Sequence, residues 1–230
     1  MKILAIQNCE IEGFGLYEEY LLAQESEHRV VHAYRERALP PVEAFDAILI
    51  GGTPISAYDA RDFPFLQREC EYLRLALAAR KPCFGICCGA QILAQLLGAQ
   101  VRKCSRREIG GYEVRLTSAG ESDPLLDGFP LFFPVFHWHG DTFEIPVGAE
   151  LLVEGDDCRN QVFRCSNVVG VQFHLEVTSK DASAWADEYA AELAELGKTK
   201  AQVVTECRER EREMRPLAYR LVHNFFEVAR

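Results

Sequence analysis

The sequence predicts an α/β fold with a mostly parallel central sheet and helices on both of its faces. Up to about residue 98, short apolar runs alternate with stretches in which apolar residues recur at helical spacing. These runs are apolar throughout, which is typical of strands that are buried on both faces. From about Gly111 the helices between the strands disappear. This change indicates antiparallel strands added to the parallel core.

The parallel part is expected to begin at the start of the chain. Short apolar runs predict four strands, at residues 2–7, 29–33, 44–50 and 82–86. Helical spacing predicts three helices, at residues 18–24, 65–79 and 90–97. Gly98 follows the last helix, in the position where glycine commonly ends a helix.

The second part of the chain predicts strands joined by turns. We expect them at residues 112–117, 132–138, 150–154, 161–165 and 168–173. A helix with an Ala-rich stripe is expected over residues 182–196.

The last part of the chain, residues 205–215, is dense in Glu and Arg. An apolar stripe at helical spacing overlaps its end and continues beyond it, made of Met214, Leu217, Leu221, Val222 and Phe225. This pattern predicts a solvated helix whose far end docks on the body of the protein. We expect one domain over residues 1–230, with a core of about 1–196 and a C-terminal helical extension of about 198–230.

Composition excludes some classes of function. The chain has 230 residues, 48% of them hydrophobic, which is enough for one substantial core. Its net charge of -10 argues against a general nucleic-acid binder, since phosphate backbones need a basic face. The basic cluster at residues 102–107 is expected to be a solvated loop. No apolar stretch approaches the length of a membrane span, so no membrane partner is expected.

The nine cysteines are scattered and form no CxxC pair, which fits neither a zinc ribbon nor a zinc finger. No metal site is expected, and no cofactor. A dinucleotide site is disfavoured because no GxGxxG follows the first strand; the segment Gly13-Phe14-Gly15 lacks the third glycine. The N-terminus reaches a polar residue too early for a signal peptide. Free thiols without an export signal predict a cytoplasmic protein.

Cys87 lies between a predicted strand and a predicted helix, with small residues on both sides. Such a turn holds its central residue in strained backbone and projects its side chain above the sheet. The N-terminus of the following helix would favour the nucleophilic thiolate. The alternative is an inert, half-buried cysteine in a Gly-rich turn.

A nucleophilic cysteine needs a base, a group that orients the base, and donors for the developing oxyanion. Among the six histidines, His174 follows an apolar run, and Glu176 comes two positions later. In extended backbone these two side chains would point to the same side. Gly52 follows the third strand, so its N–H and that of Cys88 could serve as the oxyanion donors at one sheet edge. A simple turn is the alternative for the Gly51-Gly52 pair.

The sequence resembles the class I (triad) glutamine amidotransferases, because it has five of their motifs in the order in which the family has them. It is most similar to stand-alone members that resemble the glutaminase domain of GMP synthetase. The five motifs cover about residues 45–178 and are Gly51-Gly52-Thr53-Pro54, Gly85-Ile86-Cys87-Cys88-Gly89-Ala90-Gln91, Glu108-Ile109-Gly110, His137-Trp138-His139-Gly140-Asp141 and Val171-Gln172-Phe173-His174-Leu175-Glu176. The resemblance implies a flavodoxin-like fold of this family, with added antiparallel strands.

The resemblance also implies roles for individual residues. Cys87 would be the nucleophile, His174 the base and Glu176 its partner. The oxyanion donors would be the backbone N–H groups of Gly52 and Cys88. Four residues resemble positions that line the glutamine pocket: Gln91, Gly110, Trp138 and Gly140. The chain departs from the family at Leu175, where the family often has Pro, and at Cys88, where the family varies.

Four functions remain open from the sequence. The first is a glutaminase that releases glutamate and passes ammonia to a separate synthase partner, since the chain has no synthase motif of its own. The second is a γ-glutamyl peptidase or hydrolase that uses the same triad. The third is a non-catalytic binding or regulatory module, against which the intact Cys87, His174 and Glu176 argue. The fourth, a related cysteine hydrolase or stress protein of similar fold, is disfavoured by the position of Glu176 two residues after His174.

Overall fold

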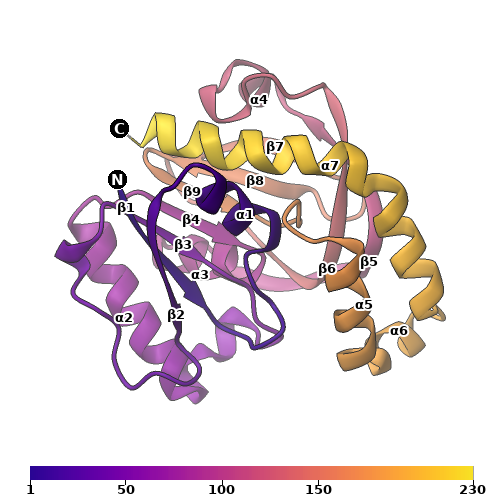
Figure 1. The fold of residues 1–230 in the computed structure, drawn as a ribbon, viewed down its shortest axis with the longest axis horizontal. Helices are drawn as coiled ribbons and strands as arrows, with labels where there is room; N and C mark the ends of the chain where they lie inside the picture. The colour runs from indigo at the N-terminus through magenta and orange to yellow at the C-terminus, as the bar shows by residue number, and fades with distance from the viewer. Residues whose placement is uncertain (230) are drawn as a thin grey trace.

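A single nine-stranded sheet forms the centre of the protein, for which the computed structural model describes residues 1–229. The strands run in the order β2-β1-β3-β4-β9-β8-β7-β5-β6 (Figure 1). They are β1 (Lys2–Gln7), β2 (Glu27–His32), β3 (Ala47–Ile50), β4 (Cys83–Ile86), β5 (Val101–Leu116), β6 (Phe132–Phe143), β7 (Glu150–Glu154), β8 (Asn160–Cys165) and β9 (Val168–Val171). The predicted α/β class, with a parallel core and added antiparallel strands, is confirmed.

The pairing of the strands changes from parallel to antiparallel at β9. Strands β2, β1, β3, β4 and β9 pair in parallel, so their carboxyl ends share one edge. Strand β9 also pairs with β8, and that pairing and those beyond it are antiparallel. Ligands of open α/β sheets bind outside the carboxyl ends of parallel strands, so this edge is where a site is expected.

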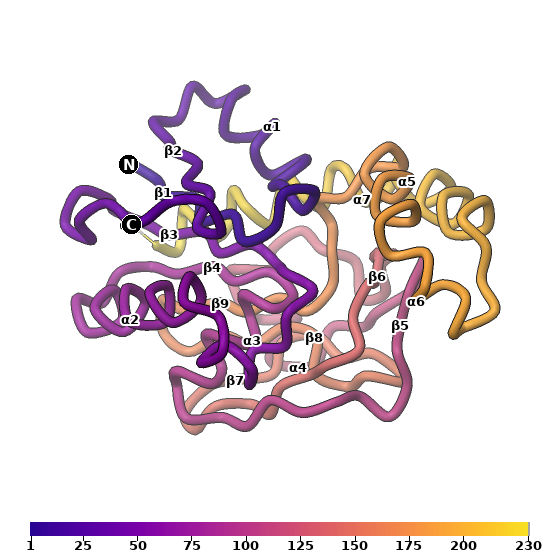
Figure 2. The backbone as a smooth tube through the Cα atoms, turned by 90° about the horizontal axis from the view of Figure 1, so that it is seen from below, coloured from indigo at the N-terminus to yellow at the C-terminus, as the bar shows by residue number. Residues whose placement is uncertain are grey.

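Helices cover both faces of the sheet. They are α1 (Gly15–Ala23), α2 (Pro64–Ala78), α3 (Cys88–Leu96), α4 (Ser118–Ser122), α5 (Ser179–Glu188), α6 (Ala190–Glu195) and α7 (Lys200–Val228), with short 3-10 turns at Val42–Ala44, Ala57–Asp62 and Pro124–Leu126. Figure 2 shows α1 and α7 on one side of the parallel strands and α2 and α3 on the other. The two faces accordingly form two separate apolar clusters.

Several predicted elements differ from the structure in their bounds. The strand expected at residues 112–117 is the end of β5 (Val101–Leu116), and the one expected at 132–138 continues to Phe143. The strand expected at residues 44–50 begins only at Ala47, because Val42–Ala44 forms a 3-10 turn. The helix expected at residues 182–196 is broken at Tyr189 into α5 and α6. At this break the Tyr189 hydroxyl reaches Glu12, far away in the sequence.

The basic cluster at residues 102–107 is part of strand β5, so its prediction as a loop was wrong. Strand β5 pairs with β6 along most of its length, with a register shift between Lys103 and Glu108. Several charged side chains in a row conceal the alternation that marks a strand, and the bulge interrupts the alternation further. One wall of the pocket described below is made of this segment.

Helix α7 packs on the body over its whole length, rather than only at its far end. Val203 and Cys207, in its first turns, are fully buried, as are Leu221 and Val222 further on. Thr199 and Gln202 form a capping box that starts the helix. That residues 1–230 form one domain with a C-terminal extension stays a prediction. No helix within residues 1–229 has the length and apolar content that crossing a membrane requires.

Candidate active site

Cys87 occupies the turn between β4 and α3 in strained backbone, with φ of 52° and ψ of -112°. Non-glycine residues rarely adopt such angles, and they do so mainly at functional sites. The turn is tight because Gly85 and Gly89 lie against each other, and a Cβ on Gly85 would come within 2.5 Å of the Gly89 backbone. The Cys87 N–H donates to the Val171 carbonyl at 2.7 Å, which ties the turn to strand β9.

The Cys87 sulfur is held between two polar groups. It lies 3.8 Å from the Trp138 carbonyl oxygen, and the Gln172 side-chain amide donates to it at 3.6 Å. Gln91 in turn donates to the Gln172 side-chain oxygen at 3.1 Å and to the Asp141 carbonyl at 3.2 Å. Gln91 therefore fixes the direction of the amide that faces the sulfur.

His174 and Glu176 form the pair that the sequence predicted. The Nδ1 atom of His174 lies 2.5 Å from Oε1 of Glu176, and both side chains are buried. Burial alone would lower the pKa of His174. The charge of Glu176, the hydrogen bond with it and the neighbouring Cys87 sulfur outweigh this effect and raise the pKa of His174 well above its usual value.

The second ring nitrogen of His174, Nε2, is buried and has no hydrogen-bond partner of its own within residues 1–229. The backbone of His174 is fixed by two hydrogen bonds with Phe136, of 2.8 and 3.1 Å. Its ring packs edge-on against Trp185, with ring centres 5.0 Å apart. The imidazole is thus oriented by Glu176, and its second nitrogen is not engaged by another hydrogen bond among the described residues.

Gly52 and Cys88, the candidate oxyanion donors, both lie next to Cys87. Gly52 follows β3, and a Cβ built on it would lie 3.6 Å from the Cys87 Cβ. Cys88 is the first residue of α3, so its N–H belongs to the first turn, whose donors have no carbonyl partner inside the helix. The Cys88 thiol donates to the Ile55 carbonyl at 3.2 Å.

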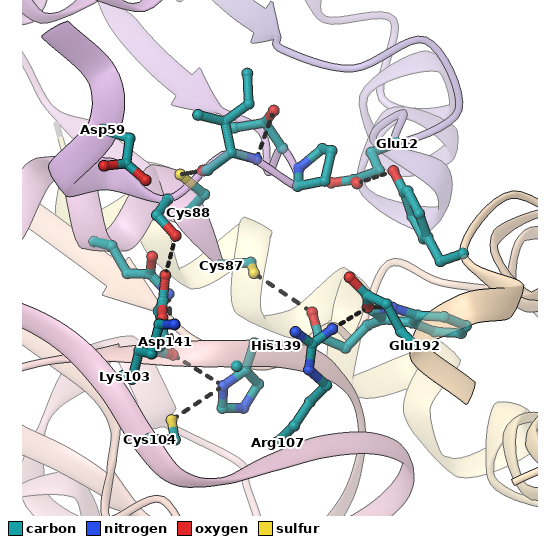
Figure 3. Close-up of a pocket in the computed structure, with 18 of the residues that line it drawn as sticks. Glu12, Asp59, Cys87, Cys88, Lys103, Cys104, Arg107, His139, Asp141 and Glu192 are labelled. Atoms are coloured by element: carbon teal, nitrogen blue, oxygen red, sulfur yellow. Dashed lines mark hydrogen bonds and ion pairs between the residues drawn. The ribbon is translucent and has the colours of Figure 1, made fainter. Parts of the chain in front are cut away.

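A pocket of about 440 Å³ opens above Cys87 and His174 (Figure 3). Such a volume is typical of small-molecule sites. Gln91, Trp138 and Gly140 line it, as the resemblance implied. Gly110 does not; it faces Glu206 and Lys198 on the side of α7.

Charged residues of both signs surround the pocket. Arg107 pairs with Glu192 at 2.7 Å, and the Trp138 indole N–H donates to the same carboxylate oxygen at 2.8 Å. Asp141 accepts hydrogen bonds from Ser56 and Tyr58, at 2.5 and 3.3 Å. Arg107 and Glu192 are labelled on one side of the pocket in Figure 3.

A buried acid lies beside the candidate oxyanion donors. Glu12 is 9% exposed and accepts a hydrogen bond of 2.6 Å from the Tyr189 hydroxyl. One of its oxygens lies close to Gly52, only 2.7 Å from where a Cβ would stand. Burial raises the pKa of Glu12, although the Tyr189 hydrogen bond opposes this shift.

Sequence reasoning missed four residues of this site: Gln172, Arg107, Glu12 and Glu192. Gln172 had a usable signal, because it stands two positions before His174 at the end of an apolar run. The other three lie on elements distant in the sequence, and no local pattern brings them together.

Comparison with known proteins agrees with this geometry. Residues 18–188 match the family model described as glutamine amidotransferase class-I. The chain belongs to this family. A glutamine amidotransferase-like protein of Salmonella typhimurium, YfeJ, is 34% identical over 90% of both chains. A crystal structure of a glutamine amidotransferase from Thermotoga maritima superimposes with a TM-score of 0.91 at 29% identity, covering 99% of this chain and 98% of the other.

Two further relatives in the family differ in what their names describe. GMP synthase of Thermosipho melanesiensis is 31% identical over 66% of this chain, and the match spans 28% of that enzyme. The chain is therefore related to the glutaminase domain of GMP synthase, as the motifs indicated. A gamma-glutamyl-L-1-hydroxyisopropylamide hydrolase of a Pseudomonas species is 31% identical over 68% of this chain and 56% of its own length.

Proposed function

We propose that this protein hydrolyses the side-chain amide of glutamine through a Cys87–His174–Glu176 triad, releasing glutamate and ammonia. The main support is the strained turn that presents Cys87 beside a buried imidazole whose partner is Glu176. In this family such a constellation is expected to act through a covalent thioester.

The reaction would start with transfer of the Cys87 thiol proton to Nε2 of His174. The raised pKa of His174 favours the resulting imidazolium, and the Gln172 amide stabilises the thiolate. The thiolate attacks the amide carbon, and the Gly52 and Cys88 N–H groups donate to the oxyanion that forms.

The carbon–nitrogen bond then breaks, and His174 gives its proton to the leaving nitrogen, which departs as ammonia. A γ-glutamyl thioester on Cys87 remains. His174, now neutral, removes a proton from water, and the hydroxide attacks the thioester carbonyl. Glutamate leaves as the Cys87 sulfur becomes a thiolate beside the imidazolium of His174. Return of the proton from Nε2 of His174 to that sulfur restores the starting thiol and neutral imidazole.

The pocket charges suit a γ-glutamyl group, which has both an α-carboxylate and an α-ammonium. Arg107 offers a positive charge for the carboxylate, and Glu192 and Asp141 offer negative charges for the ammonium. Arg107 and Glu192 already pair with each other at 2.7 Å, so the substrate would insert its own charges into this pair.

The second candidate is a γ-glutamyl peptidase or hydrolase that acts on a substituted amide. It is favoured by the named activity of the Pseudomonas relative and by the pocket, which extends beyond Cys87 to Asp59 and Lys103. A larger leaving group would occupy that part of the pocket.

One assay separates these functions. The purified, reduced protein is incubated with glutamine, glutathione and γ-glutamyl dipeptides, and glutamate and ammonia are measured. Release of ammonia from glutamine at the highest kcat/KM supports the glutaminase. Release of glutamate from dipeptides alone favours the peptidase, and no release from any of them would contradict both.

We further propose that a separate synthase receives the ammonia and that the protein works in the cytoplasm. The nine cysteines are all free, which suits a reducing compartment. A pull-down from native lysate, followed by an assay of glutaminase stimulation by the captured protein, tests the partner. Cell fractionation tests the location.

A further inference from the structure

A second cluster of reactive side chains lies at the base of the pocket, apart from the triad. Cys104 on β5, His139 on β6 and Cys158 in the connection between β7 and β8 bring their ligand atoms within 4.8 Å of one another. The two sulfur atoms are 3.5 Å apart, and the Cys104 sulfur is 3.8 Å from Nδ1 of His139. Figure 3 shows the contact between Cys104 and His139.

We propose that Cys104, His139 and Cys158 bind a zinc ion. Zinc takes thiolate and imidazole ligands in a tetrahedron, at about 2.3 Å to sulfur and about 2.0 Å to nitrogen. Ligand atoms on one such ion stand about 3.5–3.8 Å apart by that geometry. The distances from the Cys104 sulfur to the Cys158 sulfur and to Nδ1 of His139 agree with these values. A small rotation of the Cys158 side chain would bring its sulfur to the same distance from His139.

His139 is held by buried polar groups on the side of Nε2. That nitrogen lies 2.9 Å from the Glu108 carboxylate, as in an ion pair, and shares a hydrogen bond of 3.2 Å with Nδ1 of His137. Nδ1 is the ring nitrogen that faces the Cys104 sulfur. Metal-binding histidines commonly have a carboxylate beside the ring nitrogen that does not bind the ion.

Nδ1 of His139 faces the Cys104 sulfur at 3.8 Å and the Asp141 carbonyl oxygen at 3.1 Å. Because a carbonyl oxygen only accepts, Nδ1–H donates to Asp141 in the metal-free protein. A zinc ion between Nδ1 and the sulfur atoms would replace this proton, and the Asp141 oxygen or a water from the pocket can complete the four ligands.

Burial and charge suit the ion as well. His139 and Cys158 are buried, with 5% and 3% exposure, and Cys104 is partly exposed. Two thiolates balance the charge of Zn²⁺, so no net charge is added to the interior. Cys104 and His139 line the pocket, which gives the ion a way in.

Zinc at this place would cross-link three segments of the chain. It would join the bulged part of β5, strand β6 and the β7–β8 connection, three segments that contribute to or lie behind one wall of the pocket. The role is one of holding that wall in position, and no step at Cys87 depends on it. The overlapping group of Glu108, His137 and His139 is fully buried, and none but His139 lines the pocket, so we assign it to orienting His139.

The test measures metal directly. The full chain is purified in reducing, chelator-free buffer, its zinc content is determined by mass spectrometry, and zinc affinity is measured against a chromophoric chelator. Cobalt(II) is then substituted, since thiolate ligation gives sulfur-to-cobalt charge-transfer bands and tetrahedral geometry gives intense d–d bands. Cys104→Ser and Cys158→Ser each remove one ligand; Cys165→Ser, on β8, is the matched control, and Cys87→Ala reports on the triad thiol.

The expected result is one equivalent of zinc in the unmodified protein, in Cys165→Ser and in Cys87→Ala. The affinity should fall roughly 10- to 100-fold or more in Cys104→Ser and in Cys158→Ser, and the cobalt charge-transfer band should weaken to roughly half, since one thiolate remains in each. Circular dichroism checks that each variant folds, and alanine replaces serine at any position where it does not. Failure of the unmodified protein to bind zinc, or a zinc affinity in Cys104→Ser and Cys158→Ser equal to that of the unmodified protein, would overturn the proposal. A protein isolated with a Cys104–Cys158 disulfide and no zinc would also overturn it.

Discussion

The parallel and antiparallel halves of the sheet contribute different things to the site. The parallel strands supply the groups proposed for the chemistry: Cys87 after β4, Gly52 after β3, and His174 just beyond β9. The antiparallel strands β5 and β6 supply much of the pocket wall, including Arg107 and Trp138.

This division has a physical cause. Parallel strands bring their carboxyl ends to one edge whatever their side chains are, so backbone topology alone gathers the catalytic groups. The wall depends on the register of β5 against β6 and on the bulge between Lys103 and Glu108. We therefore expect changes in the parallel half to act on the rate of the chemical steps, and changes in the antiparallel half to act on substrate binding.

The largest effect is expected from Cys87→Ala. Removing the nucleophile should lower kcat for glutamine by roughly 10⁴-fold or more, because no thioester can form. Steady-state ammonia release measures this loss, and Cys165→Ser is the control. A Cys87→Ala protein with normal activity would contradict the assignment of the nucleophile.

The next effect is expected from Glu176→Gln, which keeps the shape of the side chain and removes its charge. We expect kcat to fall roughly 10²- to 10⁴-fold. Glu176 raises the pKa of His174, so its loss should lower that pKa. The alkaline limb of the pH profile of kcat/KM, where His174 loses its proton, should then move to lower pH. Glu188→Gln, exposed on α5, is the control, and an alkaline limb that stays in place would contradict the pairing.

A smaller effect on the rate is expected from Gln172→Leu. The substitution removes the amide that donates to the Cys87 sulfur at 3.6 Å and leaves a side chain of similar size. The rate of Cys87 alkylation by iodoacetamide and kcat should both fall, roughly 10- to 100-fold, as one hydrogen bond to a charged group is lost. Gln95→Leu, exposed on α3, is the control. Unchanged alkylation would show that the amide does not stabilise the thiolate.

The smallest effect is expected from Arg107→Ala in the antiparallel half. KM for glutamine should rise about 3- to 10-fold while kcat changes little, because the lost charge binds the ground state and the transition state alike. Full Michaelis curves for this variant and for the exposed control Arg37→Ala measure both constants. A fall in kcat with constant KM would break the division between the two halves.

The sequence predicted the parallel half and its residues well. Cys87, His174 and Glu176 lie together as expected because each follows or ends a short apolar strand, and strand ends meet at one edge. Gly52 lies beside Cys87 for the same reason.

The pocket wall formed by β5 and β6 was predicted less well. The segment 102–107 lacks an alternating pattern, so its strand could not be recognised. Gly110 faces α7 because the β5 bulge shifts which residues point toward the pocket. The proposed zinc ligands come from three segments that are distant in the sequence: Cys104, His139 and Cys158. No spacing motif could therefore predict them.

The position of β9 has a consequence for how the protein is made. The Cys87 N–H is held by the carbonyl of Val171, and β4 pairs with β9, a strand that is synthesised much later. While the ribosome is still adding the intervening residues, β4 lacks this neighbour and the turn at Cys87 lacks its anchor. His174 emerges only after β9. In a partly synthesised chain, the thiol proposed as the nucleophile therefore lacks both its backbone anchor at Val171 and its neighbour His174 until β9 has joined the sheet.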